Sequence, residues 1–296
     1  MRHLSRRHPI ATFLVITYLA TLAIFAVPFV SSSGIGLVDL DLPGVAPFIL
    51  LSTISLALAA FGVTALADGR DGVRDLRRRV FHFRVNPVWL VGALILLPLI
   101  GLVVVTAMYG INPIVRMASD PELIGSTILL GALVAFLLVN WWEEAAWTGF
   151  ALHRLQDRLG AVRASVVTTW MQATLHLPLV FIADGVTDGR VPAEQVPFYL
   201  VALYVLPIPV RIIITWLYNA SGRSVPVVGL LHAGLGITTG TAYLPVIAPG
   251  FEIAWVYAGF AVVALALLAA TRGHLGHRRA SDARSGLPAG VAVASR

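Results

Sequence analysis

The chain alternates between long apolar segments and short polar connections. Each apolar segment has the length that a helix needs to cross a bilayer, about 20 residues. Glycine and proline mark many of the segment ends. About eight such segments cover residues 9–30, 46–67, 87–109, 124–149, 161–183, 197–218, 225–246 and 251–271. The pattern predicts an all-α fold, a polytopic membrane bundle of about eight transmembrane helices.

Composition supports the same prediction. Only 12% of the 296 residues are charged, whereas a soluble domain has about 25%. The lipid bilayer is therefore an expected partner. Cysteine is absent, which excludes disulfides, thiolate metal sites and a cysteine nucleophile.

Arginine, which supplies all 21 basic residues, alternates from one connection to the next. It is frequent at the N-terminus, in 68–86, in 150–163 and after 219, whereas the intervening connections are mainly acidic. This alternation predicts a multi-pass protein of the cell membrane with both termini cytoplasmic. The run Arg77–Arg79 is interpreted as an orientation signal with some anionic-lipid contact, and not as a partner site. We expect no nucleic-acid partner.

Four regions are expected along the chain. Residues 1–120 would form N-terminal transmembrane helices, 121–245 a central group of helices and 246–273 the last transmembrane helix. Residues 274–296, rich in Gly, Ala, Ser and Arg, would form a disordered cytoplasmic tail.

Two adjacent carboxylates lie in an apolar stretch. Thirteen of the fifteen acidic residues are in polar connections, and the other two are Glu143 and Glu144. A carboxylate at such a depth costs several kcal/mol unless it has a partner, a wet cavity or a function. The alternative is a structural polar network between helices.

Two histidines, His176 and His232, also fall inside apolar segments. A hairpin that turns at Gly160 would place Glu143 and His176 at the same height, about 25 Å from the turn. His232 would lie at a similar depth. Arg211 is interpreted as a structural residue that snorkels or pairs with a backbone carbonyl.

This set of side chains suits water activation. A glutamate in a semi-dry cavity can take a proton from water, and histidines can orient that water or stabilise an oxyanion. Alternatively, Glu143, His176 and His232 supply three ligands for a divalent metal such as zinc. The HExxH and GxSxG signatures of soluble zinc proteases and serine hydrolases are absent.

Three motifs occur in order across residues 140–236. They are EEAAWTGFALHRLQ, WMQATLHLP and WLYNASGRSVPVVGLLHAGLG. They resemble EExxxR-G, FxxxH and WLYNRTGGS-HAxxN of the CPBP or Abi family, the CAAX prenyl endopeptidases and bacteriocin-processing intramembrane proteases.

The resemblance implies that residues 121–245 form a CPBP/Abi-like catalytic core, with a site that opens toward the cytoplasm. Glu143 matches the catalytic glutamate, Glu144 its neighbour, His176 the second-motif histidine and His232 the oxyanion-holding histidine. The substrate would be a peptide or a membrane protein. Family members are regarded as metalloproteases, and a metal-free glutamate mechanism is also argued.

The chain departs from the motifs at three positions. Thr148 replaces the arginine, Gln172 the phenylalanine and Gly236 the asparagine. Gln172 is a candidate to restore a lost donor.

Three functions compete on these residues. The first is an intramembrane endopeptidase, with catalytic Glu143, Glu144, His176 and His232. The second is a catalytically impaired relative that acts as a membrane binding scaffold. The third, a proton-coupled transporter, is disfavoured because no internal repeat is found.

Overall fold

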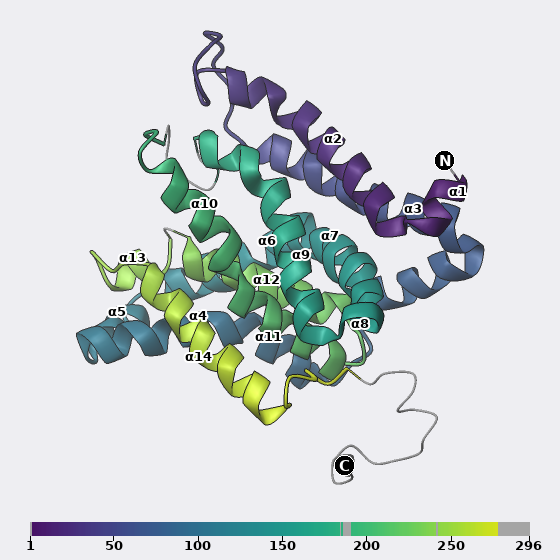
Figure 1. Ribbon diagram of the computed structural model, residues 1–296. Helices are drawn as coiled ribbons and strands as arrows, with labels where there is room; N and C mark the ends of the chain where they lie inside the picture. The colour runs from purple at the N-terminus through teal and green to yellow at the C-terminus, as the bar shows by residue number, and fades with distance from the viewer. Residues whose placement is uncertain (1, 184, 186–190, 241, 278–296) are drawn as a thin grey trace.

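The computed structural model describes residues 2–183, 185, 191–240 and 242–277, and no strand occurs among them (Figure 1). The first half contains α1 (Arg2–Arg7), α2 (Pro9–Val30), α3 (Ala46–Val80), α4 (Pro87–Tyr109), α5 (Asn112–Ala118), η1 (Leu123–Gly131), α6 (Ala132–Ala135), η2 (Phe136–Asn140) and α7 (Trp141–Glu144). The second half contains η3 (Ala145–Leu152), α8 (His153–Leu159), α9 (Ala161–His176), η4 (Leu177–Phe181), α10 (Val196–Val205), α11 (Pro207–Ala220), α12 (Val225–Thr239), α13 (Leu244–Ile247) and α14 (Ala254–Ala270).

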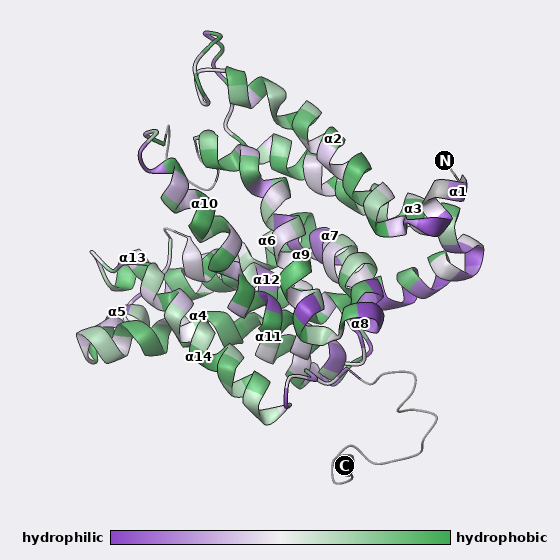
Figure 2. Ribbon diagram, viewed as in Figure 1, coloured by the Kyte–Doolittle hydropathy of each residue, from purple (hydrophilic) through white to green (hydrophobic). Residues whose placement is uncertain are grey.

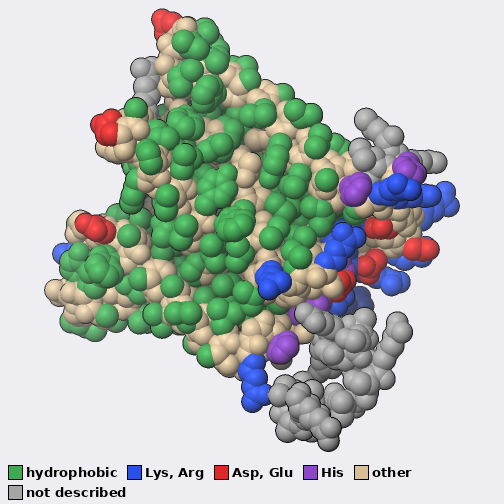
Figure 3. Space-filling model, in the orientation of Figure 1, with side chains coloured by type: hydrophobic (Ala, Val, Ile, Leu, Met, Phe, Trp, Pro, Cys, Tyr) green, Lys and Arg blue, Asp and Glu red, His purple; other side chains and the backbone are tan. Residues whose placement is uncertain are grey.

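Six helical segments of the described chain are long and apolar enough to cross a membrane, and α14 is a shorter apolar helix of 17 residues. Apolar residues predominate along the helices (Figure 2), and most of the charged side chains on the face drawn in Figure 3 gather at one end of the bundle. The prediction of an all-α polytopic bundle is therefore confirmed.

Several predicted segment bounds differ from the structure. The segment 161–183 is helical only to His176, because the 3₁₀ turn Leu177–Phe181 follows with Pro178 in its first turn. The segment 46–67 continues as a helix to Val80 across a kink at Gly69 (φ 70°). Most of the expected disordered tail, residues 278–296, lies outside the described residues.

Helix α12 packs against α4, α6, α7 and α11 in the interior of the bundle. It lies close to α7 because Gly229 has no side chain. A Cβ atom there would lie 3.0 Å from the Phe136 ring and 3.1 Å from the Trp141 Cα. This approach brings His232, one turn further along α12, to the helix that carries the two glutamates.

The α8–α9 hairpin turns at Gly160 (φ 77°), as the sequence predicted. Its first arm is fastened to α11 by a reciprocal amide pair. The Asn219 Nδ2 donates to the Gln156 Oε1 at 2.7 Å, and the Gln156 Nε2 donates to the Asn219 Oδ1 at 3.3 Å. Asn219, which belongs to the third motif, therefore joins α11 to α8 at a position away from the glutamates.

The close approach of α12 to α7 gives a testable pair of variants. We expect Gly229→Val to lower the thermal unfolding midpoint of the detergent-purified protein, because the new side chain would meet backbone and ring atoms. Gly236→Ala in the same helix is the control. A Cβ there meets nothing within 4 Å, and alanine favours helix by about 1 kcal/mol. Equal midpoints for both variants would contradict this packing.

Candidate active site

The two glutamates lie on one short α-helical turn, Trp141–Glu144, between the π-helical segments Phe136–Asn140 and Ala145–Leu152. Such π-helical turns widen a helix and frequently occur at functional sites. The turn is tied to the end of α3, since the Trp141 Nε1 donates to the Val80 carbonyl at 2.8 Å.

Glu144 is completely buried, and both of its carboxylate oxygens are engaged. Arg211 of α11 donates to the Oε2 at 2.8 Å and to the Oε1 at 3.2 Å. The Thr148 hydroxyl donates to the Oε2, and the His232 Nδ1 lies 2.9 Å from the Oε1. Glu144 is thus a fully partnered anion that joins three segments of the bundle.

The interpretation of Arg211 as snorkelling or paired with a backbone carbonyl was wrong. Its side chain is buried and forms a bidentate ion pair with Glu144. It also donates to the Thr148 Oγ1 at 3.0 Å. The Arg211 guanidinium therefore lies beside Thr148, the residue that replaces the motif arginine, although Arg211 belongs to a different helix, α11.

Glu143 has a different environment from its neighbour. Its Oε2 lies 3.9 Å from the His232 Nδ1, and its side chain forms no hydrogen bond within the described residues. The residue keeps 7% of its surface exposed, whereas Glu144 keeps none. Glu143 is consequently the carboxylate with capacity left for an added molecule.

His232 contacts both glutamates from α12. With its Nδ1 beside the Glu144 carboxylate, that nitrogen carries a proton and donates it, which leaves the Nε2 as the nitrogen able to meet a substrate. Glu144 thus fixes the orientation of this ring.

His176 ends α9, and its Nδ1 lies 2.9 Å from the Gln172 carbonyl oxygen. The Gln172 side chain accepts from Arg211. Within the described chain, no hydrogen bond joins His176 to either glutamate, so the connection runs through Gln172 and Arg211. Gln172 serves here as an acceptor rather than as the donor considered from the sequence.

Gly236, which replaces the motif asparagine, lies one turn beyond His232 and is exposed. Its missing side chain leaves open space, since an added Cβ atom would have nothing within 4 Å. The departure at this position has no replacement donor that the structure identifies.

The candidate metal ligands are Glu143, His176 and His232. The described residues contain no group of three or more His, Cys, Asp or Glu side chains placed to hold a metal ion. Glu143, His176 and His232 therefore do not form a ligand set in this arrangement. Use of zinc stays a prediction, and the chemistry argued for this site rests on the side chains alone.

Comparisons with known proteins agree with the motifs. Residues 125–238 match the family model of type II CAAX prenyl endopeptidase Rce1-like proteins. A CAAX prenyl protease 2 from Methanococcus maripaludis is 27% identical over 107 residues, which make up 36% of this chain and 39% of the relative. The resemblance to the CPBP family is confirmed for this segment, which contains both glutamates, both histidines and Arg211.

The buried ion pair predicts a large effect of one substitution. Arg211→Met should destabilise the protein by about 3–5 kcal/mol, because it leaves the Glu144 charge buried and unpaired. Arg211→Met with Glu144→Gln removes both charges and should be less destabilised than Arg211→Met alone. Unfolding in detergent micelles measures both changes.

A relocated arginine provides the sharper control. In Arg211→Ala with Thr148→Arg, the guanidinium returns to the motif position, and stability should recover relative to Arg211→Ala alone. If Arg211→Met unfolds at the wild-type midpoint, the ion pair does not support the fold.

Proposed function

We propose that this protein is an intramembrane endopeptidase of the CAAX-protease type, with Glu143 as the general base. The observation that carries the proposal is the contrast between adjacent glutamates. Glu144 is saturated by Arg211, Thr148 and His232, whereas Glu143 keeps an available carboxylate at the edge of the same cluster. The match of residues 125–238 to Rce1-like endopeptidases supports the reaction class.

In the proposed reaction, Glu143 accepts a proton from a water molecule, and the water oxygen bonds to the carbonyl carbon of the scissile amide. The carbonyl π electrons move to the oxygen and form an oxyanion. When the carbonyl re-forms, the C–N bond breaks, and Glu143 returns its proton to the leaving nitrogen. The Glu144 carboxylate, which takes part in four hydrogen bonds with three residues, could not exchange protons in this way.

His232 is the proposed oxyanion donor. Its ring is oriented by Glu144 through the Nδ1. In the imidazolium form, in which both ring nitrogens carry a proton, the Nε2 donates a hydrogen bond to the carbonyl oxygen as charge develops there. His176 is proposed to orient the water or the substrate through its own Nε2, because its Nδ1 is held by the Gln172 carbonyl.

The substrate is proposed to be a peptide or membrane protein that approaches from the cytoplasmic side. Most of the arginine side chains that Figure 3 shows gather at one end of the bundle, which favours a cytoplasmic location for that end and for both termini. The curated relative is a CAAX prenyl protease by its name, so a prenylated C-terminal peptide is the first substrate to assay.

Glu143→Gln tests the mechanism. We expect cleavage of a prenylated CAAX peptide in liposomes to fall by about 10²-fold or more, because the amide cannot take the water proton. The unfolding midpoint should stay near that of the wild type, since the Glu143 side chain has no hydrogen bond within the described chain to lose. Mass spectrometry of the released peptide measures the rate.

Glu144→Gln is the matched control, because it should lower the unfolding midpoint as well as the rate. Undiminished cleavage by Glu143→Gln would remove Glu143 from the mechanism.

A further inference from the structure

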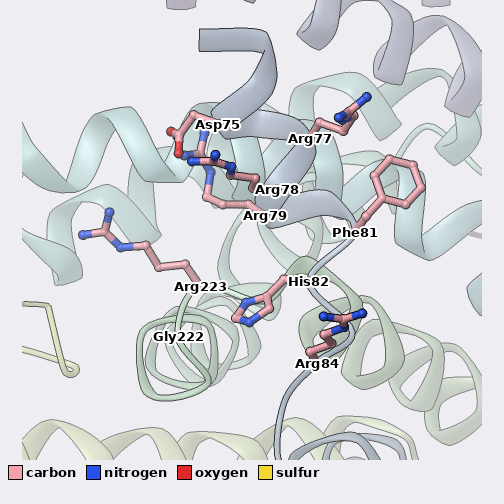
Figure 4. A pocket seen from close by; sticks show the side chains of 9 residues that line it. All are labelled: Asp75, Arg77, Arg78, Arg79, Phe81, His82, Arg84, Gly222 and Arg223. Carbon is pink, nitrogen blue, oxygen red and sulfur yellow. The ribbon is translucent and has the colours of Figure 1, made fainter. Parts of the chain in front are cut away.

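A concavity lies at the arginine-rich end of the bundle, outside the glutamate cluster. It is formed by the end of α3 with the following residues and by the turn between α11 and α12 (Figure 4). Its volume is about 750 Å³, within the range of small-molecule sites. The charged side chains that line it are Asp75, Arg77, Arg78, Arg79, Arg84 and Arg223.

Charge balance in this concavity is incomplete. Five guanidinium groups share its wall with a single carboxylate among the described residues, Asp75, which pairs with Arg79. The His82 ring also lines the concavity and adds a nitrogen that can donate or accept a hydrogen bond. Like charges that line one concavity repel one another, and a bound anion would reduce that repulsion.

Arg79 supplies an independent indication of a missing acceptor. Its side chain is 9% exposed, and its Nε is buried with no hydrogen-bond partner in the described chain. A buried donor on a charged group is costly to leave unpaired. Figure 4 shows Arg78 and Arg79 beside Asp75, with His82 and Arg223 on the neighbouring wall.

Arg223 is held in a backbone conformation that favours glycine. Its φ is 68°, and the motif WLYNRTGGS has glycine at the matching position. A non-glycine residue in the left-handed region costs about 1–2 kcal/mol. Strain of this kind is concentrated at functional sites, and here it adds a cation to the wall.

The arrangement suits a phosphate group. Arginine forks bind phosphate oxygens in pairs, and the concavity opens at the end where a membrane protein meets anionic headgroups. We propose that this concavity binds a phosphate group, supplied by the headgroup of an anionic phospholipid. His82 lines the concavity, and its carbonyl accepts a hydrogen bond from the Ser224 hydroxyl at the start of α12 at 2.7 Å. A lipid bound beside His82 would therefore also stabilise the start of α12.

The test measures binding and does not depend on cleavage. The full chain in a neutral detergent is titrated with phosphatidylglycerol, phosphatidylcholine or inorganic phosphate. Thermal unfolding and native mass spectrometry are the readouts. We expect phosphatidylglycerol to raise the midpoint and remain as an adduct, and phosphatidylcholine to do neither.

Arg223→Gly is the decisive variant, because glycine suits the backbone at this position and the fold should be retained. Loss of one charge-assisted contact should weaken phosphatidylglycerol binding about tenfold. Arg78→Gln, at an exposed position of the wall, should weaken it similarly. Arg272→Gly is the matched control, since Arg272 also has a positive φ (49°) but lies outside this concavity.

Each outcome has a defined meaning. Stabilisation by inorganic phosphate alone, lost in Arg223→Gly, supports the phosphate site and assigns it to a free anion. Equal losses in Arg223→Gly and Arg272→Gly would overturn the site in favour of general surface charge. Stronger protection by a hexaglutamate peptide than by phosphatidylglycerol would also overturn it, in favour of an acidic peptide.

Discussion

The buried ion pair between Glu144 and Arg211 is the interaction on which the arrangement of this bundle depends. Glu144 is completely buried, so no water replaces a lost partner there, and its charge must be matched by side chains from the packed helices. The pair joins α7 to α11, and its further contacts reach α9 through Gln172 and α12 through His232. Four helices are therefore positioned by one carboxylate and one guanidinium.

The same pair separates the roles of two adjacent residues. Neighbours on a helix point about 100° apart, so Glu143 cannot share the contacts that saturate Glu144. The short α turn between two π-helical segments places one carboxylate inside the network and the other at its edge. The difference in chemistry that we propose for the two glutamates follows from this geometry, since the side chains are identical.

Much of this could be predicted from the sequence, because the signals are local or additive. The lengths of the apolar segments predicted the helical bundle, and Gly160 predicted the turn of the α8–α9 hairpin. The expected depth of His232 in the membrane placed it at the level of the glutamates. The partner of Glu144 was missed, although Arg211 is the one basic residue of the segment 197–218, and matching buried charges of opposite sign would have suggested it. The early end of α9 beside Pro178 and the kink at Gly69 are local breaks that the length of an apolar segment does not report.

The cation that partners Glu144 comes from residue 211 in this chain and not from residue 148, where the motif has arginine. Thr148 is small enough to admit the Arg211 side chain, and its hydroxyl both accepts from that guanidinium and donates to Glu144. An aliphatic residue at 148 would leave both groups short of a partner, and a second arginine there would add an unmatched buried cation. Residues 148 and 211 are therefore physically coupled, and the departure at Thr148 does not remove the cation that a buried glutamate requires.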